Sequence, residues 1–170
     1  MSSFYSTLSE ANDYFDNRLH ERAWSEATVA NRQKALLAAT RIIDQLNFKG
    51  HKATVHTLLE ANPCATDEEI RAAEAEQELE FPRGEDTLVP ETIKLATYEI
   101  AYNLLDERDP EKELERLMVT SERFANVATG YNRDQVPIDH ILNHIPSALA
   151  WRWLAPFLRD DDTLKLSRVS

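Results

Sequence analysis

The chain has 170 residues, 42% of them hydrophobic and 29% charged, with a formal net charge of -11 and a single cysteine. This composition suits one globular domain, and it excludes an internal disulfide, a membrane-spanning helix of roughly 20 apolar residues and a signal peptide with a basic start and an apolar centre. Because residues 61–118 hold 17 acids against six bases, and no stretch clusters lysine and arginine, the sequence also argues against a protein that grips nucleic acid through its phosphates.

Helix is the predicted state of the N-terminal quarter, which has few glycines. Thr7 and Glu10 have the spacing of a capping box, which predicts a short helix over residues 8–20. Ser25 is expected to cap a second, longer helix. The apolar residues of that helix recur at helical spacing between residues 35 and 46, the clearest amphipathic stripe in the chain.

The next segments alternate between loop and helix. Residues 53–65 are interpreted as a loop or frayed turn that closes with an Asn-Pro pair. Thr66 and Glu69 repeat the capping-box spacing before an alanine- and glutamate-rich helix that extends to about residue 80. Because its apolar face is thin, we expect this helix to be exposed or to pack on another chain. Residues 81–90, with two prolines and a glycine, predict an ordered loop.

Two further helices precede a change in sequence texture. Pro90 suits the first turn of a helix whose buried stripe extends from Ile93 to Leu105, and Pro110 begins a short charged helix in the same way. Residues 119–136 contain β-branched residues in loose alternation with polar ones. This pattern predicts a two-stranded hairpin or an extended arm.

Ser147 is expected to cap the last helix, and Pro156 to bend or end it. Helical spacing divides the large apolar residues of this helix between two faces. The face expected in the core carries Trp151, Leu154 and Leu158. The face expected at an interface carries Trp153 and Phe157.

The predicted fold is therefore mainly α: a compact helical bundle with a protruding extended hairpin or arm and a C-terminal tail. We expect a single domain over residues 1–159, with its arm at about residues 119–136. The tail would cover residues 160–170, beginning at three consecutive aspartates.

No residue pattern predicts catalysis, a cofactor or a metal. His140 and His144 have the spacing of zinc ligands on one helix face, but no third ligand is marked, which favours surface or partly buried histidines. Cys64 has no local signature of a nucleophile. The three glycines are too far apart for a phosphate-binding loop, and the carboxylates of residues 67–80 do not follow an EF-hand.

A series of segments resembles a known family. The segments are "EANDYFDNRLHERAW", "KALLAATRIIDQLNFKGHKA", "ELEFPRG", "VPETIKLATYEIAYNLLD" and "IPSALAWRWLAPFL". In this order they are similar to head-to-tail connector proteins of tailed phages, the adaptors that bind under the portal ring. The resemblance covers most of residues 8–159 and includes the spacing between the segments.

The resemblance implies a structural protein of the virion, without enzymatic activity, that is made in the host cytoplasm and lies at the head–tail junction. Its implied partners are the portal protein, tail or nozzle proteins, and other copies of itself in a ring of twelve. The genomic DNA would pass through the channel of that ring without specific binding. A negative surface could line this channel or face outward toward basic partners, and the sequence leaves both open.

The resemblance also implies roles for particular residues, because in this family a hairpin contacts neighbours or tail proteins and the C-terminal tail docks on the portal. The implied inter-subunit or tail contacts are Phe124, Val127, Tyr131, Arg133, Trp153 and Phe157. The implied portal-docking residues are Leu164, Lys165, Leu166, Arg168 and Val169.

Two other functions stay open. Several proteins of this family carry the label "DnaT-like single-stranded-DNA-binding", and the Trp151-Arg152-Trp153 segment could stack on bases, which gives a DNA-binding accessory of phage replication or packaging as the alternative. The acidic balance argues against it. A small metal-dependent enzyme is a more distant hypothesis.

Overall fold

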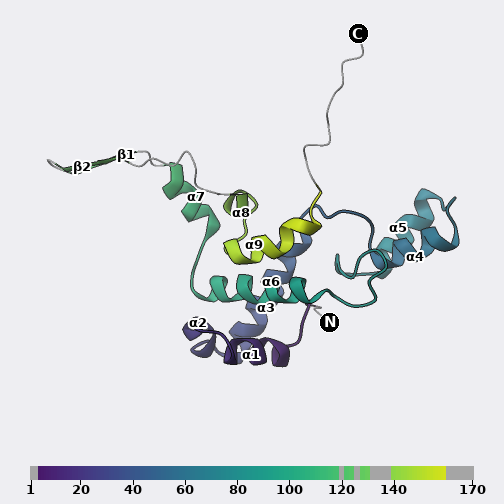
Figure 1. Ribbon diagram of the computed structural model, residues 1–170, viewed down its shortest axis with the longest axis horizontal. Coiled ribbons are helices and arrows are strands. Elements are labelled where there is room, and N and C mark those ends of the chain that lie inside the picture. Colours follow the sequence, from purple (N-terminus) through teal and green to yellow (C-terminus); the bar gives the residue numbers. More distant parts are fainter. Residues whose placement is uncertain (1–3, 119–120, 125–126, 131–138, 160–170) are drawn as a thin grey trace, which may run out of the picture.

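The computed structural model describes residues 4–118, 121–124, 127–130 and 139–159 (Figure 1). The protein is mainly helical, as predicted. Its helices in the first two thirds of the chain are α1 (Leu8–Asp16), α2 (Arg22–Ser25), α3 (Val29–Asp44), α4 (Ala53–Ala61), α5 (Asp67–Glu76), α6 (Glu91–Leu105) and α7 (Pro110–Met118). The strands β1 (Ser121–Phe124) and β2 (Val127–Gly130) follow, and then α8 (Asp139–Leu142), α9 (Ala148–Leu154) and a short 3-10 helix, η1 (Ala155–Phe157).

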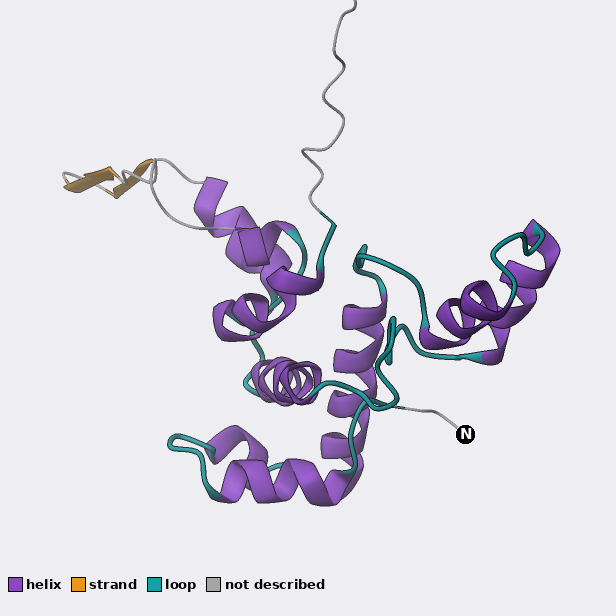
Figure 2. Ribbon diagram, turned by 45° about the vertical axis from the view of Figure 1, so that its right-hand side comes forward, coloured by secondary structure: helices purple, strands orange, loops and turns teal. Residues whose placement is uncertain are grey.

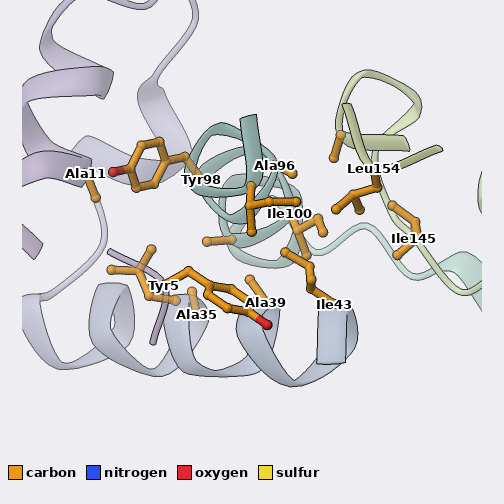
Figure 3. Packing of buried hydrophobic residues seen from close by; sticks show 14 of the residues in the cluster. Tyr5, Ala11, Ala35, Ala39, Ile43, Ala96, Tyr98, Ile100, Ile145 and Leu154 are labelled. Carbon is orange, nitrogen blue, oxygen red and sulfur yellow. The ribbon is translucent and has the colours of Figure 1, made fainter. Parts of the chain in front are cut away.

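The core lies around α6, which packs against α3 on one side and α9 on another (Figure 2). Ile43 of α3, Ile100 of α6 and Leu154 of α9 are each fully buried, and Figure 3 shows them meeting beside α6. Burying an aliphatic side chain of this size contributes about 1.5–3 kcal/mol. The helical stripes predicted within α3 and α6 are therefore the faces that hold the bundle together.

An aromatic cluster fastens the N-terminal helices to this core. The ring of Phe15 in α1 stacks on Trp24 of α2 at 4.3 Å and lies 5.8 Å from Tyr102 of α6. The ring centroids of Tyr14 and Tyr98 lie 5.1 Å apart. These offset pairs add to the area that each ring buries, so α1 and α2 cover one side of α6.

Two parts project from the bundle in Figure 1. One is the hairpin of α4 and α5, whose helices pack mainly on each other. The other is α7 with the strands beyond it. β1 and β2 pair antiparallel, with Phe124 opposite Val127, and both strands fall inside the arm predicted at residues 119–136. The rest of that range lies outside the described residues.

The first helix is shorter than the predicted range of residues 8–20. Its capping box between Thr7 and Glu10 is present as predicted, but α1 ends at Asp16. The Arg18 guanidinium bonds back to the carbonyls of Leu19 and His20, and His20 has a φ of 59°. A left-handed residue cannot continue the helix, so the segment turns.

The cap predicted for the long helix was assigned to the wrong residue. Ser25 is the last residue of α2, and its hydroxyl donates to the carbonyl of Arg22. Thr28 caps α3 instead, with its hydroxyl accepting the amide of Asn31 at 3.2 Å. Both residues are good caps, and the turn that lays Trp24 on Phe15 decides between them.

The loop predicted at residues 53–65 is wrong over most of its length, because Ala53–Ala61 form α4. Val55 is fully buried, and the Thr54 hydroxyl donates to the carbonyl of Ala73 in α5 at 2.7 Å. A helix this short is marginal by itself. Its packing partner α5 stabilises it, and local sequence carries little of that information.

Candidate interaction surfaces

The C-terminal helix α9 has the cap and the buried face that its sequence predicts. The Ser147 hydroxyl accepts the amide of Ala150 at 3.2 Å, and Leu154 on the predicted core face is fully buried. Pro156 lies in η1, where the α-helix has ended. Trp151 and Trp153 are both half-buried and both pack against the core cluster, so the two faces differ less than the spacing implies.

Phe157, predicted as a contact to another protein, lies in an aromatic group of this chain. Its ring meets Phe81 edge-on at 5.5 Å, and Phe81 meets Phe48 in the same way at 4.7 Å. The Lys49 amide donates to the Phe157 carbonyl at 2.8 Å. The half-buried ring of Phe157 therefore offers only its outer edge to a partner.

The exposed apolar side chains near the C-terminus are leucines that sequence reasoning did not select. Leu142 of α8 is 52% exposed and Leu149 of α9 is 42% exposed. Leu149 is the second residue of the last helix, and a helical wheel of α9 places it away from Leu154. Both leucines are exposed apolar side chains on consecutive helices, α8 and α9.

The remaining predicted contact residues lie in the strand hairpin or outside the described residues. Phe124 and Val127 are described by their backbone alone, as partners in the hairpin register. Tyr131 and Arg133 lie outside the described residues, as do all five residues of the predicted portal-docking segment: Leu164, Lys165, Leu166, Arg168 and Val169.

The base of the α4–α5 hairpin is tied to the body by polar contacts. The Lys52 ammonium donates to the Gln77 carbonyl at 3.0 Å. Arg83 donates to the carbonyl of Lys49 at 3.1 Å and to that of Gly50 at 2.7 Å, and also pairs with Glu80. The loop of residues 77–84 thus positions the hairpin.

Asp44 joins the same region to the N-terminus. It accepts hydrogen bonds from the Tyr5 hydroxyl and, at 3.3 Å, from the Glu80 amide. Burial raises the pKa of Asp44 above its ordinary value, although both hydrogen bonds favour the charged form. Burial and the hydrogen bond to Asp44 raise the pKa of Tyr5. This carboxylate therefore has a structural role, since it connects three segments.

The acidic helix predicted after Thr66 is α5, and it is exposed apart from Ala73 and the half-buried Ile70. Its capping box is present, with the Glu69 carboxylate accepting the Thr66 amide at 2.7 Å. These bonds to Thr66 lower the pKa of Glu69. Asp67, Glu68, Glu74 and Glu76 form no ion pair within the described part of the chain.

A pocket with a volume of about 690 Å³ lies between α4, the end of α5 and the loop after Pro82. His56, Glu60, Glu76, Glu85 and Asp86 are among its lining residues, which makes it acidic. In residues 4–117 and 139–159, no three His, Cys, Asp or Glu side chains are grouped as metal ligands. Cys64 is exposed in the turn between α4 and α5.

The two histidines at zinc-ligand spacing do not share a helix face. α8 ends at Leu142, and His144 has a φ of 57°. The left-handed residue turns the chain so that Ile145 is fully buried. Among the described helices, none combines the length and the apolar character needed to cross a membrane.

Comparisons of the chain with protein-family models, with curated proteins and with solved structures found no match.

Proposed function

We propose that this chain is a structural virion protein, a head-to-tail connector that docks under a portal ring and joins it to the tail. The proposal includes a ring of copies, twelve by the family resemblance, and a channel that the genomic DNA crosses during ejection. The chain would act at the head–tail junction without catalysis, after synthesis in the host cytoplasm.

The observation that carries the proposal is the form of the subunit. A helical body presents a helical hairpin and a strand hairpin as separate projections (Figure 1). The α4–α5 hairpin packs mainly on itself and so exposes surface that a neighbour can cover. A ring subunit needs two unlike surfaces of this kind, because each copy contacts the next through a different patch.

The distribution of charge supports the same function. Residues 61–118 hold 17 of the 30 acids of the chain, and this segment has only six bases. Repeated around a ring, such surfaces repel phosphates within a Debye length of about 8–10 Å. A channel that passes DNA without holding it benefits from this repulsion, and an outward acidic face would instead meet basic partners.

For attachment to the portal we propose the C-terminal segment, residues 160–170, assisted by the leucines at the end of the body. Leu142 and Leu149 are exposed on α8 and α9, and the segment follows directly on η1 in sequence. Leu164, Leu166 and Val169 would add apolar contact to the portal, while Lys165 and Arg168 would meet acidic groups.

The alternative is a single-stranded-DNA-binding accessory protein that uses Trp151, Arg152 and Trp153. Base stacking needs an open aromatic face beside cationic groups. Arg152 is exposed, but both tryptophan rings pack against the core cluster. This geometry favours the connector.

The decisive experiment locates the protein in phage particles by electron cryomicroscopy. We expect a ring of density between portal and tail that fits the helical body. Particles assembled with a chain lacking residues 160–170 should lose this ring.

Two results would contradict the proposal. One is absence of the protein from tailed particles that contain a complete junction. The other is salt-dependent binding of single-stranded DNA at micromolar protein that Trp153→Ala abolishes while the fold is kept, which would support the DNA-binding alternative.

A further inference from the structure

One face of α3 carries positive charge that is exposed among the described residues. Lys34, Leu37 and Arg41 share this face, since residues three, four and seven apart lie on one side of a helix. Lys34 and Arg41 are exposed, and Leu37 between them is half-buried. Within the described part of the chain, neither cation forms an ion pair or a hydrogen bond. We call Lys34, Leu37 and Arg41 the α3 strip.

One face of α5 has the opposite character. At 100° per residue, three of its five acids lie together with two alanines, and Arg71 lies just outside this face. We call it the α5 face, and it consists of the exposed residues Glu68, Glu69, Ala72, Ala75 and Glu76. Within the described part of the chain α5 packs mainly on α4, and all five residues of this face are exposed.

The two surfaces match in spacing as well as in charge. Lys34 and Arg41 are seven residues apart, which is about 10.5 Å along a helix. Glu69 and Glu76 have the same separation. Between the charged ends, the α3 strip presents Leu37 and the α5 face presents Ala72, a small residue that lets two helices approach closely.

We propose that the α5 face of one copy binds the α3 strip of the next copy. Because the two patches differ, the contact is heterologous. Repeating it forms a closed ring when the rotation from one copy to the next divides a full turn evenly. The inference deepens the proposed function and rests on it, since it identifies the surfaces by which copies of the connector would meet. It also assigns a role to the acidic helix.

Charge reversal with complementation tests the contact. The first variant combines Lys34→Glu with Arg41→Glu, and the second combines Glu68→Lys with Glu76→Lys. Glu69 is kept because its carboxylate caps α5. Self-association is measured by sedimentation velocity at low salt over a concentration series reaching the millimolar range, with thermal unfolding to check the fold.

We expect the wild-type chain to associate as concentration rises, and each variant alone to associate at least about tenfold more weakly, because two charges on one side of the contact are reversed. An equimolar mixture should recover association, since the reversed α3 strip of one variant then meets the reversed α5 face of the other. Arg108→Glu with Lys112→Glu is the matched control. It makes the same charge change as the first variant, at ion pairs outside the two surfaces, and should leave association unchanged.

The contact is overturned if the wild-type chain stays monomeric throughout, if the reversals leave its association unchanged, or if two folded variants fail to recover on mixing. These outcomes are independent of the location of the protein in particles. If the protein is found at the head–tail junction but the charge reversals do not change its self-association, only the proposed contact is refuted. A chain that associates in this way but is missing from particles refutes the proposed function.

Discussion

Glu99 in the middle of α6 is a carboxylate only 2% exposed, and its partners come from the N-terminal helix. Arg18 binds it through two nitrogens, at 2.6 and 2.9 Å, and the Tyr14 hydroxyl donates to it at 2.7 Å. The guanidinium also lies over the ring of Tyr102 at 4.1 Å. Burial disfavours the charged form of Arg18, but the pairing with Glu99 outweighs it and raises the pKa of Arg18.

Removing Glu99 should be costly, because the Arg18 guanidinium, only 23% exposed, and the Tyr14 hydroxyl then lose their shared acceptor in the protein interior. We expect Glu99→Ala to lower the free energy of unfolding by about 3 kcal/mol, measured by urea denaturation. Glu26→Ala is the control: its pair with Arg22 is exposed and should contribute far less than the buried pair. Equal effects of the two substitutions would contradict a structural role for Glu99.

The ion pair of Glu10 should make the stability of the fold depend on pH. The hydrogen bond from Lys94, at 2.5 Å, and the bonds from Thr7 lower the pKa of Glu10 from 4.5 to about 2. A lowered pKa in the folded state means that this carboxylate stabilises the fold above pH 4.5, and that the contribution is lost as pH falls toward 2.

Glu10→Gln keeps an acceptor for the cap and removes the charge. At pH 7 we expect it to lower the free energy of unfolding by about 0.5 kcal/mol, since the pair is largely exposed. The difference in free energy of unfolding between the variant and the wild type should shrink as pH falls from 4.5 toward 2. Thermal unfolding at a series of pH values measures this difference. Glu115→Gln, at an exposed position of α7, should show no such trend. A difference that is constant with pH would refute the ion pair.

At the scale of elements, α3 and α5 have the same kind of cap but different surroundings. Thr28 caps α3, which carries fully buried core residues. Thr66 caps α5, which packs mainly on α4. Segments with few buried contacts open at free energies below that of global unfolding. The hairpin should therefore open by itself.

Thr66→Ala should weaken α5 by about 1 kcal/mol without lowering the midpoint of global unfolding. Hydrogen exchange is expected to speed up at the amides of α4 and α5 and to stay unchanged in α6. Thr28→Ala is the matched control, and it should lower the global midpoint because α3 belongs to the core. If Thr66→Ala lowers that midpoint equally, then the hairpin is part of the cooperative unit.

At the scale of the whole molecule, the body and the C-terminal segment are expected to have separate roles. Deletion of residues 160–170 keeps the described core cluster, which ends at Leu154, and keeps Phe157 and Leu158, which pack against it. The truncated chain should keep its unfolding midpoint and lose binding to the portal, measured by co-sedimentation. Normal portal binding by the folded truncated chain would refute the docking role of this segment.

The isolated chain should be largely monomeric at micromolar concentration and form a ring on the portal. Exposed charge pairs contribute little each, so the contact between copies needs the portal to hold them at high local concentration. Size-exclusion chromatography with light scattering tests the first part. A stable ring of the isolated chain would contradict it.

Local patterns in the sequence were sufficient for several elements. The capping boxes at Thr7 and Thr66 and the cap at Ser147 were predicted correctly, because each depends on residues three positions apart. The buried stripes of α3 and α6 follow from helical periodicity in the same way. The exposed state of the acidic helix followed from its thin apolar face.

Tertiary packing decided what the sequence alone did not determine. α4 is helical because α5 covers it, and Thr28 rather than Ser25 caps α3 because of the turn around Trp24. Phe157 lies beside Phe81, a partner that no local pattern indicates. Arg18 and Glu99 are 81 residues apart. Periodicity gives the direction of a side chain from its own helix, whereas its partner depends on how distant helices meet, and only the fold brings them together.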